Sequence, residues 1–241
     1  MASQHGYDSR IFSAPEARCT RFADRILERV DAMRPLRVLD IGCGTGTQLL
    51  TLAALLPQAT FTGIDLAPAN VAAASARAQA LGLQGRMTFV AADYLAHAAG
   101  QQDLILSYST LQLIPGDSRA LFGKIGHELV PGGLLMNVMP YECTYNRLLL
   151  VFRRVLAGVR FPGLDEAGFR VARLVHGAEW SDAMLRERIT YMYASFERLD
   201  GRALRQLMRD ECSLDTVEEL PEPHASLAQA MHKLIISRRR S

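Results

Sequence analysis

A glycine-rich turn, Val-Leu-Asp-Ile-Gly-Cys-Gly-Thr-Gly, fills residues 38–46 and places three glycines directly after a short apolar run that contains Asp40. Glycine lacks a Cβ, so its backbone can approach a ligand closely and can adopt a positive φ in a tight turn. In an open α/β sheet, ligands bind beyond the carboxyl ends of the strands. The turn therefore predicts a small molecule lying against bare backbone at the end of a first strand.

Two further acids follow strand-like segments. Asp65 ends the run Gly-Ile-Asp-Leu at 63–66, and Asp93 follows an apolar segment at 87–92. A carboxylate at the end of the second strand can accept hydrogen bonds from both hydroxyls of a ribose. The alternative is that Asp65 caps the next helix, and Asp93 could be a simple turn residue. We favour the ribose contact for Asp65.

The spacing of the glycines excludes two common nucleotide-binding turns. A dinucleotide fingerprint, Gly-x-Gly-x-x-Gly, would need a third glycine at position 47, where this chain has Thr47. A Walker loop would need Gly-Lys-Ser or Gly-Lys-Thr, which the segment lacks. The turn is therefore typical of neither ligand class.

Residues 38–46 resemble, at every position, the first motif of the class I S-adenosylmethionine-dependent methyltransferases. Residues 63–66, 90–94, 103–112 and 128–133 resemble later motifs of that family, and the resemblance covers roughly residues 36–139. Among its members, the chain is most similar to small-molecule enzymes of the trans-aconitate and natural-product type. The resemblance implies S-adenosylmethionine as cofactor, S-adenosylhomocysteine as product, no metal, and methyl transfer to an O, N or C atom of a small molecule.

The same resemblance assigns contacts with the cofactor. It implies that Asp40 holds the ammonium of the methionine moiety, directly or through water, and that Asp65 binds the ribose. Asp93 accepts from the exocyclic amine of adenine, and the backbone near Ser107 contacts the methionine moiety. The predicted cofactor-binding residues are Asp40, Gly42, Cys43, Gly44, Thr45, Gly46, Asp65, Leu66, Asp93, Tyr94, Ser107 and Tyr108.

No catalytic residue is assigned, because in-line methyl transfer depends mainly on positioning. The weak candidates for a base or an acceptor contact are Tyr7, Gln112, Tyr145 and His176. A tyrosine on an apolar helix is more often a core residue with a satisfied hydroxyl, and we interpret Cys43 as a packing residue. Relatives often carry a histidine-tryptophan pair where this chain has Gln112-Leu113, so a carboxylate acceptor is not implied.

Two other functions stay open. One is a non-methylating reaction on the same cofactor, such as aminopropyl transfer, although those enzymes usually offer acids where this chain has Ser107-Tyr108-Ser109. The other is a non-catalytic binding module, which the presence of all three acids disfavours. Nucleic-acid methylation is disfavoured because an Asn/Asp-Pro-Pro-Tyr motif and a basic face are absent from the sequence.

The elements that position these residues alternate between strand and helix. Strands that are apolar throughout, separated by helices, indicate a parallel sheet covered on both faces. We expect a Rossmann-like, doubly wound α/β fold with a mostly parallel seven-stranded sheet. The expected strands are 36–41, 60–66, 87–92, 103–107, 134–139, 213–220 and 231–237, and the expected helices of this region are 47–56, 68–81 and 117–129.

The pattern changes after Pro140, where nearly seventy residues carry helical signals only. We expect an N-terminal helical lid at 1–35, a cofactor-binding core at 36–140, a helical cap inserted at 141–209, and the last strands at 210–241. Residues 148–156 predict a mostly apolar helix, buried against the core or against a second subunit as a homodimer. Trp180, Ser181 and Leu185 predict a capped helix start.

Composition sets the remaining bounds. The chain has 241 residues, 49% of them hydrophobic, and a formal charge of +2, with one basic cluster at 238–240. That balance favours a globular protein with a small-molecule partner and neither nucleic acid nor membrane. The four cysteines form no Cys-x-x-Cys pair, and no signal peptide or spanning segment is present in the sequence, so we expect a cytoplasmic location.

Overall fold

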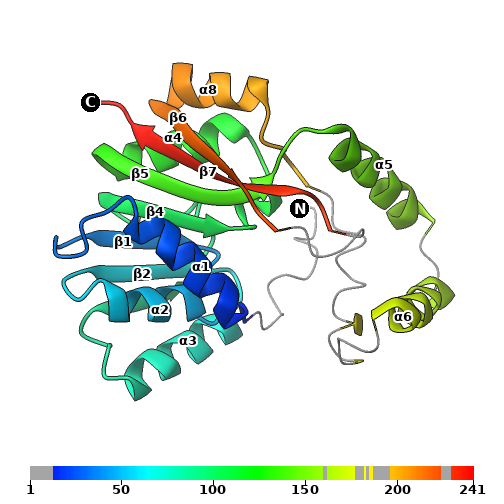
Figure 1. The fold of residues 1–241 in the computed structure, drawn as a ribbon, viewed down its shortest axis with the longest axis horizontal. Helices are drawn as coiled ribbons and strands as arrows, with labels where there is room; N and C mark the ends of the chain where they lie inside the picture. Colours follow the sequence, from blue (N-terminus) through cyan, green and yellow to red (C-terminus); the bar gives the residue numbers. More distant parts are fainter. Residues whose placement is uncertain (1–12, 160–161, 177–181, 183–184, 187–195, 224–228) are drawn as a thin grey trace.

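The computed structural model describes residues 13–159, 162–176, 182, 185–186, 196–223 and 229–241, and the predicted Trp180 and Ser181 helix start lies outside these residues. Figure 1 shows the arrangement of the elements. They are α1 (Glu16–Leu27), β1 (Arg37–Ile41), α2 (Thr47–Leu55), β2 (Thr60–Asp65), α3 (Pro68–Ala80), β3 (Met87–Ala91), β4 (Gln102–Tyr108), a 3-10 turn (Leu111–Leu113), α4 (Ser118–Glu128), β5 (Leu129–Pro140), α5 (Thr144–Gly158), α6 (Pro162–His176), α8 (Arg202–Cys212), β6 (Leu214–Pro221) and β7 (His232–Arg239).

The strands form one seven-stranded sheet in the order β3-β2-β1-β4-β5-β7-β6. Strands β1 to β5 run parallel, and β7 pairs antiparallel with both β5 and β6. The predicted doubly wound, mostly parallel sheet is thus confirmed. The chain order reverses between β1 and β4, which is the place where such sheets bind ligands.

The apolar strands are explained by burial on both faces. In β1, Val38 belongs to a cluster with α1, α2 and α3, whereas its neighbour Leu39 belongs to a cluster with α4 and α8. Successive side chains of a strand point to opposite faces, so every position of a central strand meets a helix layer. Figure 1 shows these two groups of helices against the sheet.

Strand β5 differs from its predicted bounds of 134–139. It begins at Leu129 and runs through Pro131 and Gly132, both exposed. The β4–β5 register shifts between Gln102 and Leu104, so the ladder passes this irregular stretch without breaking. The sequence predicted a later start for this strand because proline and glycine weaken a regular strand.

Helix α8 packs on α4 on the second face of the sheet. Its residues Leu204, Met208 and Cys212 are buried in the same cluster as the α4 side chains. At the crossing, a Cβ on Gly126 would overlap the carbonyl oxygen of Cys212, so glycine sets the close approach of the two helices. The first residues of α8 lie within the range expected for the inserted cap, and they contribute to the core.

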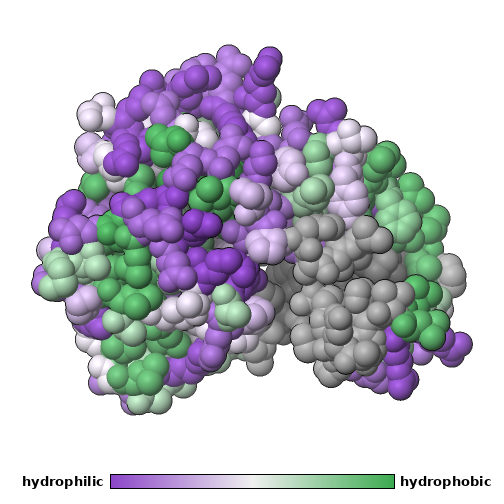
Figure 2. Space-filling model, in the orientation of Figure 1, coloured by the Kyte–Doolittle hydropathy of each residue, from purple (hydrophilic) through white to green (hydrophobic). Residues whose placement is uncertain are grey.

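Helices α5 and α6 lie beyond the carboxyl ends of the parallel strands, at the end of the sheet where α1 begins (Figure 1). The prediction that the apolar helix is buried against the core is wrong for its apolar stripe: Leu148, Val151, Phe152 and Val155 are 52–65% exposed. Figure 2 shows these apolar side chains gathered over α5. In the described part of the chain, no helix is long and apolar enough to cross a membrane.

Candidate functional site

The glycine turn between β1 and α2 takes a backbone shape that requires glycine. Gly42, Gly44 and Gly46 have φ of +79°, +54° and +75°, in the left-handed region that L side chains rarely adopt. A Cβ on Gly42 would overlap the side chain of Thr110, and one on Gly46 would lie 2.9 Å from the ring of Phe89. The turn therefore packs under the loop after β4 and presents bare backbone at the end of β1.

Asp65, the acid at the end of β2, is hydrogen-bonded to the glycine turn. Its Oδ2 accepts from the backbone N–H of Gly44 at 2.9 Å, and its Oδ1 accepts from Ala67 N–H at 2.9 Å and from Asn70 Nδ2 at 3.0 Å. The residue that caps α3 is Ala67, with no side-chain cap bond. Asp65 therefore joins the turn to the start of α3, a different role from the simple helix cap that the sequence left open.

Asp40 lies in a small pocket beside the turn. The pocket is lined by Ala14, Arg18, Asp40, Gly42, Cys43, Gln48 and Tyr108. Burial, with a smaller contribution from the charge of Asp65, raises the pKa of Asp40 to about 7, although the charge of Arg18 lowers it. The pocket thus contains a buried carboxylate beside a guanidinium.

Arg18 reaches this pocket from α1, which the sequence motifs did not single out. Its guanidinium carbon lies 4.1 Å from the centroid of the Tyr108 ring, which is also in edge contact with Phe22 at 5.6 Å. The Tyr108 hydroxyl donates to Glu222 at 2.9 Å, and burial beside that carboxylate raises the pKa of Tyr108 to about 12. The sequence did contain one indication of this placement: Arg18 lies four residues before Phe22, so the two side chains share the apolar face of the helix.

Other predicted residues of the turn serve its packing. Cys43 is 7% exposed, and burial raises the pKa of its thiol, which fits a packing residue and not a nucleophile. Arg77 of α3 donates to the carbonyl oxygen of Thr45 at 2.8 Å and to Thr47 Oγ1 at 2.9 Å. Leu66 is half-buried next to Asp65.

Beyond β3, the side chains of Asp93 and Tyr94 have different surroundings. Asp93 is half-buried, and its Oδ1 accepts from Leu95 N–H at 2.9 Å, as a turn residue does. Tyr94 is 3% exposed and donates to Glu128 at 2.9 Å under α4. The Tyr94 side chain is thus engaged with the α4 layer, which leaves only its backbone for the predicted contact.

The end of β4 and the 3-10 turn after it contain two of the predicted polar residues. Ser107 is fully buried and donates to the carbonyl oxygen of Ile41 at 3.1 Å, so its hydroxyl ties β4 to β1. Gln112 is 2% exposed, and no described residue bonds its Oε1. Ser109, between them, has a φ of +57°, an unusual conformation for a residue with a side chain.

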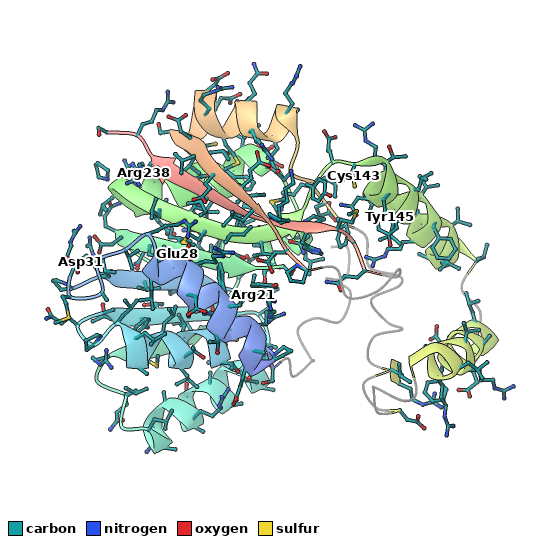
Figure 3. The ribbon with its side chains drawn as sticks, in the orientation of Figure 1. Arg21, Glu28, Asp31, Cys143, Tyr145 and Arg238 are labelled. Carbon is teal, nitrogen blue, oxygen red and sulfur yellow. The ribbon has the colours of Figure 1, made fainter. Side chains whose placement is uncertain are left out.

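The remaining catalytic candidates are placed as follows. Tyr145, labelled in Figure 3, lies at the start of α5 and donates to the carbonyl oxygen of Gln229 at 3.3 Å. His176 is the last residue of α6, and its side chain lies outside the described residues, as does Tyr7. In the described part of the chain, no group of His, Cys, Asp and Glu side chains is arranged to hold a metal ion.

Comparisons with known proteins agree with this geometry. Residues 38–133 match the family described as "Methyltransferase domain". The chain is 33% identical over 180 residues to a trans-aconitate 2-methyltransferase of Streptomyces avermitilis, covering 73% of this chain and 58% of that protein. It is 34% identical over 137 residues to one from Acidovorax sp. (strain JS42), covering 56% of this chain and 50% of that protein.

The solved structures most relevant here share the fold at low identity. Magnesium protoporphyrin IX methyltransferase from Synechocystis PCC 6803, with bound SAH, has a TM-score of 0.63 and 17% identity, covering 94% of this chain and 83% of that chain. The cyclase SpnF has a TM-score of 0.62 and 17% identity, covering 97% and 85%.

The chain spans about half the length of the curated relatives that it matches. Residues 38–133, which contain the glycine turn and its three acids, match the methyltransferase domain family, and the chain has the class I methyltransferase fold.

Proposed function

We propose that this protein binds S-adenosylmethionine and transfers its methyl group to an O, N or C atom of a small molecule. The observation that carries the proposal is the alignment of three acids along one edge of the sheet. Asp40, Asp65 and Asp93 stand at or just beyond the carboxyl ends of β1, β2 and β3, which are adjacent strands. The bare glycine turn lies at the same edge.

The chemistry of these donors fits the cofactor. Carboxylates suit its ammonium, its ribose hydroxyls and its adenine amine, all of which donate hydrogen bonds. Gly42 and Gly46 have no space for a Cβ, so the turn keeps the smooth backbone that a nucleoside needs. We propose Asp40 for the ammonium, Asp65 for the ribose and Asp93 for the adenine, with backbone groups of residues 42–46 beside them.

When bound, S-adenosylmethionine supplies an electrophilic methyl group on a sulfonium sulfur. The residues of this chain then have to hold the acceptor atom in line and keep water out, which can supply much of the acceleration. Helices α5 and α6 lie beyond the strand ends where the acceptor would enter, and we propose that the inserted region to which they belong forms its cap. Gln112 is a buried polar side chain in the 3-10 turn after β4, and no described residue bonds its Oε1, so it is our candidate for an acceptor contact.

The acceptor belongs to the small-molecule class. The matched relatives are named for trans-aconitate, and we propose a small molecule of the same size class without assigning that acid. Gln112 is a neutral amide, and the nearby cation Arg198 donates to the carbonyl oxygens of Leu111, Ile114 and Gly116. With that guanidinium already engaged, a carboxylate acceptor has no evident partner at this loop.

A non-methylating reaction on the same cofactor is the second candidate. The likeness to the cyclase SpnF favours keeping it open, because it shows that this fold occurs in a protein named for another reaction. Product analysis by mass spectrometry separates the two. Methyl transfer predicts S-adenosylhomocysteine and an acceptor heavier by one CH₂ group, whereas a non-methylating reaction predicts a product without that added CH₂ group.

The test of cofactor binding is calorimetry with S-adenosylmethionine and S-adenosylhomocysteine. Asp65→Asn should weaken both by at least tenfold, because a shared ribose contact through a charged group is worth roughly 1.5–3 kcal/mol. Asp103→Asn is the matched control, since that carboxylate accepts from Arg37 at the start of β4. Equal affinity of Asp65→Asn and the control would refute the ribose assignment.

Two expectations from the sequence remain part of this proposal. We propose a cytoplasmic location, which the free state of all four cysteines supports. We also propose a homodimer through the exposed apolar stripe of α5, which a soluble monomer would not normally leave in water.

A further inference from the structure

We infer that the amide oxygens of Gln112 and Asn137 bind the acceptor molecule, each by accepting a hydrogen bond from it. The acceptor is then a compound that carries O–H or N–H groups, such as a phenol, an alcohol or an amine, and not a carboxylate. The inference rests on the proposed function. It adds the chemical class of the acceptor and a second binding residue, Asn137, which the sequence motifs did not single out.

Both side chains are buried, and their amide oxygens have no partner in the described part of the chain. Gln112 is 2% exposed and Asn137 is 1% exposed. No described residue donates a hydrogen bond to Gln112 Oε1 or to Asn137 Oδ1. Proteins pair nearly all of their buried polar groups, because an unpaired group loses its hydration without compensation. The two oxygens therefore indicate a donor that comes from outside the chain.

Asn137 interrupts a row of apolar side chains on the sheet face that α4 and α8 cover. Its partner in β7 is Ile235, and its neighbours two residues away on the same face are Leu135 and Met139. All three belong to the apolar cluster under these helices. An amide in such surroundings costs stability that a leucine would not cost. Packing alone therefore does not explain an asparagine at this position.

The neighbouring hydroxyl does not supply the missing donor. Ser107 is the partner of Asn137 in β4, and its Oγ donates to the carbonyl oxygen of Ile41 at 3.1 Å. A serine hydroxyl has one proton, so this proton is engaged with β1. Ile41 directly precedes Gly42, so Asn137 lies at the level of the sheet where the glycine turn begins.

The 3-10 turn that carries Gln112 lies beside the same end of β5. Ser109 N–H donates to the carbonyl oxygen of Val138 at 2.8 Å, so the chain stays bonded to β5 just past the end of β4. Leu111 of the turn is buried in the apolar cluster of the α4 face. Gln112 and Asn137 therefore belong to one region, where β4 and β5 end.

The backbone of the turn is held by other parts of the chain. The carbonyl oxygen of Gln112 accepts from Glu197 N–H at 2.8 Å, and Arg198 donates to the carbonyl oxygens of Leu111 and Ile114. The turn is thus fixed in place while the side-chain oxygen of Gln112 stays unpaired. A group that is positioned in advance binds a ligand with little cost of ordering.

An amide oxygen selects for hydrogen-bond donors. It carries no charge and accepts from O–H and N–H groups, whereas an ionised carboxylate can only accept. Because an amide is too weak a base to remove a proton at neutral pH, we assign binding and orientation to these residues, and not proton transfer.

The first experiment asks whether Asn137 lowers the stability of the ligand-free protein. Asn137→Leu replaces the amide by an apolar side chain of similar size, so Tm should rise by about 2 °C or more. Asn146→Leu is the matched control, because the amide of that buried asparagine makes three hydrogen bonds. Its Tm should fall by about 6 °C or more. A fall in Tm for Asn137→Leu would overturn the inference, since it would show that the amide is already paired.

The second experiment measures methylation of matched phenols, anilines and benzoates, with trans-aconitate as a further carboxylate, by mass spectrometry. We expect methylated phenols or anilines and no methyl esters. Gln112→Leu and Asn137→Leu should each raise KM for the acceptor by about 3- to 10-fold, the loss of one neutral hydrogen bond, and leave the affinity for S-adenosylhomocysteine unchanged. Gln206→Leu, which removes an exposed amide from α8, is the control and should match the wild type.

The other outcomes separate this inference from the proposed function. Methyl esters as the main products would show that the amides present their nitrogens to the acceptor, and equal KM values in the wild type and both variants would show that they do not contact it. Either result would overturn the inference while the proposed function stands. A wild type that binds S-adenosylhomocysteine but methylates none of the compounds would refute the acceptor class. A wild type that binds no cofactor would overturn the proposed function itself.

Discussion

At the scale of single residues, Gly42 shows that the glycine turn depends on the absence of a side chain. Its φ of +79° excludes most side chains, and an added Cβ would overlap Thr110. Gly132 in β5 has nearly the same φ, +78°, but nothing within 4 Å of its Cβ position. The two glycines thus share one backbone strain and differ in the space around them.

We predict that Gly42→Ala loses both stability and cofactor affinity, whereas Gly132→Ala loses stability only. The left-handed backbone costs roughly 1–2 kcal/mol in each, or a fall in Tm of about 2–8 °C for a chain of this size. Gly42→Ala should exceed that because Thr110 must move. Differential scanning calorimetry measures the first effect and titration with S-adenosylhomocysteine the second. A smaller loss in Gly42→Ala than in Gly132→Ala would contradict the packing explanation.

Asp40 should make the stability of the cofactor-free protein depend on pH. Its folded-state pKa is raised from 3.8 to about 7, so the folded protein binds more protons than the unfolded chain between those values. Stability from this group is therefore lost as pH rises from about 4 to about 7. Urea unfolding at pH 5 and pH 8 should show a larger loss for wild type than for Asp40→Asn. Parallel losses in the two proteins would count against a raised pKa.

The residue scale also shows how far the sequence alone could predict local geometry. Gly42, Gly46 and Asp65 could be identified because a glycine motif and a strand-end acid constrain the backbone locally. Arg18 could not, because its place in the pocket depends on how α1 docks on Tyr108, a contact between residues far apart in the chain. Tyr94 carried a local motif, yet its ring is buried toward Glu128.

At the scale of elements, the buried side chain of Asn146 anchors the start of α5. Asn146 is 0% exposed, and its Nδ2 donates to the carbonyl oxygens of Tyr141 at 2.7 Å and Met231 at 2.8 Å. Its Oδ1 accepts from Met231 N–H at 2.8 Å. These three bonds hold the start of α5 against the start of β7.

We predict that Asn146→Ala lowers the free energy of unfolding by about 3 kcal/mol, because it leaves several buried backbone groups without partners at roughly 1–3 kcal/mol each. Arg147→Ala is the control. Its side chain is 68% exposed in an ion pair with Glu142, so its effect should stay within about 0.5 kcal/mol. Urea unfolding measures both, and similar values would show that Asn146 is not an anchor.

Several elements of the core were predictable because the central strands contain apolar runs and because helices α2 and α3 begin next to a glycine or at a proline. Helix α3, for example, has Pro68 in its first turn and Gly82 just after its end. The exposure of α5 was not predictable in the same way. An apolar stripe in a sequence indicates a face that another surface covers, but it does not identify that surface. In the structure, the apolar stripe of α5 faces away from the core.

At the scale of the whole molecule, the return of the chain from the region of α5 and α6 is bound to the loop after β4. Arg198 is 7% exposed and donates to the carbonyl oxygens of Leu111, Ile114 and Gly116 and to Ser118 Oγ. The neighbouring Glu197 N–H donates to the carbonyl oxygen of Gln112 at 2.8 Å. Residues 196–200 therefore connect the outer helices to the loop that carries Gln112.

We predict that Arg198→Met lowers Tm by about 6–12 °C, which corresponds to roughly 3 kcal/mol in a chain of this size. Arg209→Met should have little effect, because Arg209 is 59% exposed and pairs only with its neighbour Asp210 among the described residues' ion pairs. Thermal melts of both variants test this, and an unshifted Arg198→Met would show that the loop holds itself.

The exposed stripe of α5 gives a prediction for assembly. If it pairs two copies, Val151→Glu with Val155→Glu should yield monomers of unchanged stability, since both side chains are 58% exposed. Val217→Glu, on β6 and 53% exposed, should leave assembly unchanged. Sedimentation velocity distinguishes them. A wild-type protein that is monomeric at all concentrations would refute the dimer.

The antiparallel strand β7 has a consequence for synthesis. It lies between β5 and β6, although it comes after both in the chain. During synthesis, the edge of β5 that pairs with β7 therefore stays unpaired while about 100 further residues are added, which takes roughly 5–20 s. The nucleoside-binding half, from β1 to β4, needs no such delay. A nascent chain could thus form the sheet edge proposed to bind the ligand while the edge of β5 is still open to pairing with strands of other chains or to binding a chaperone.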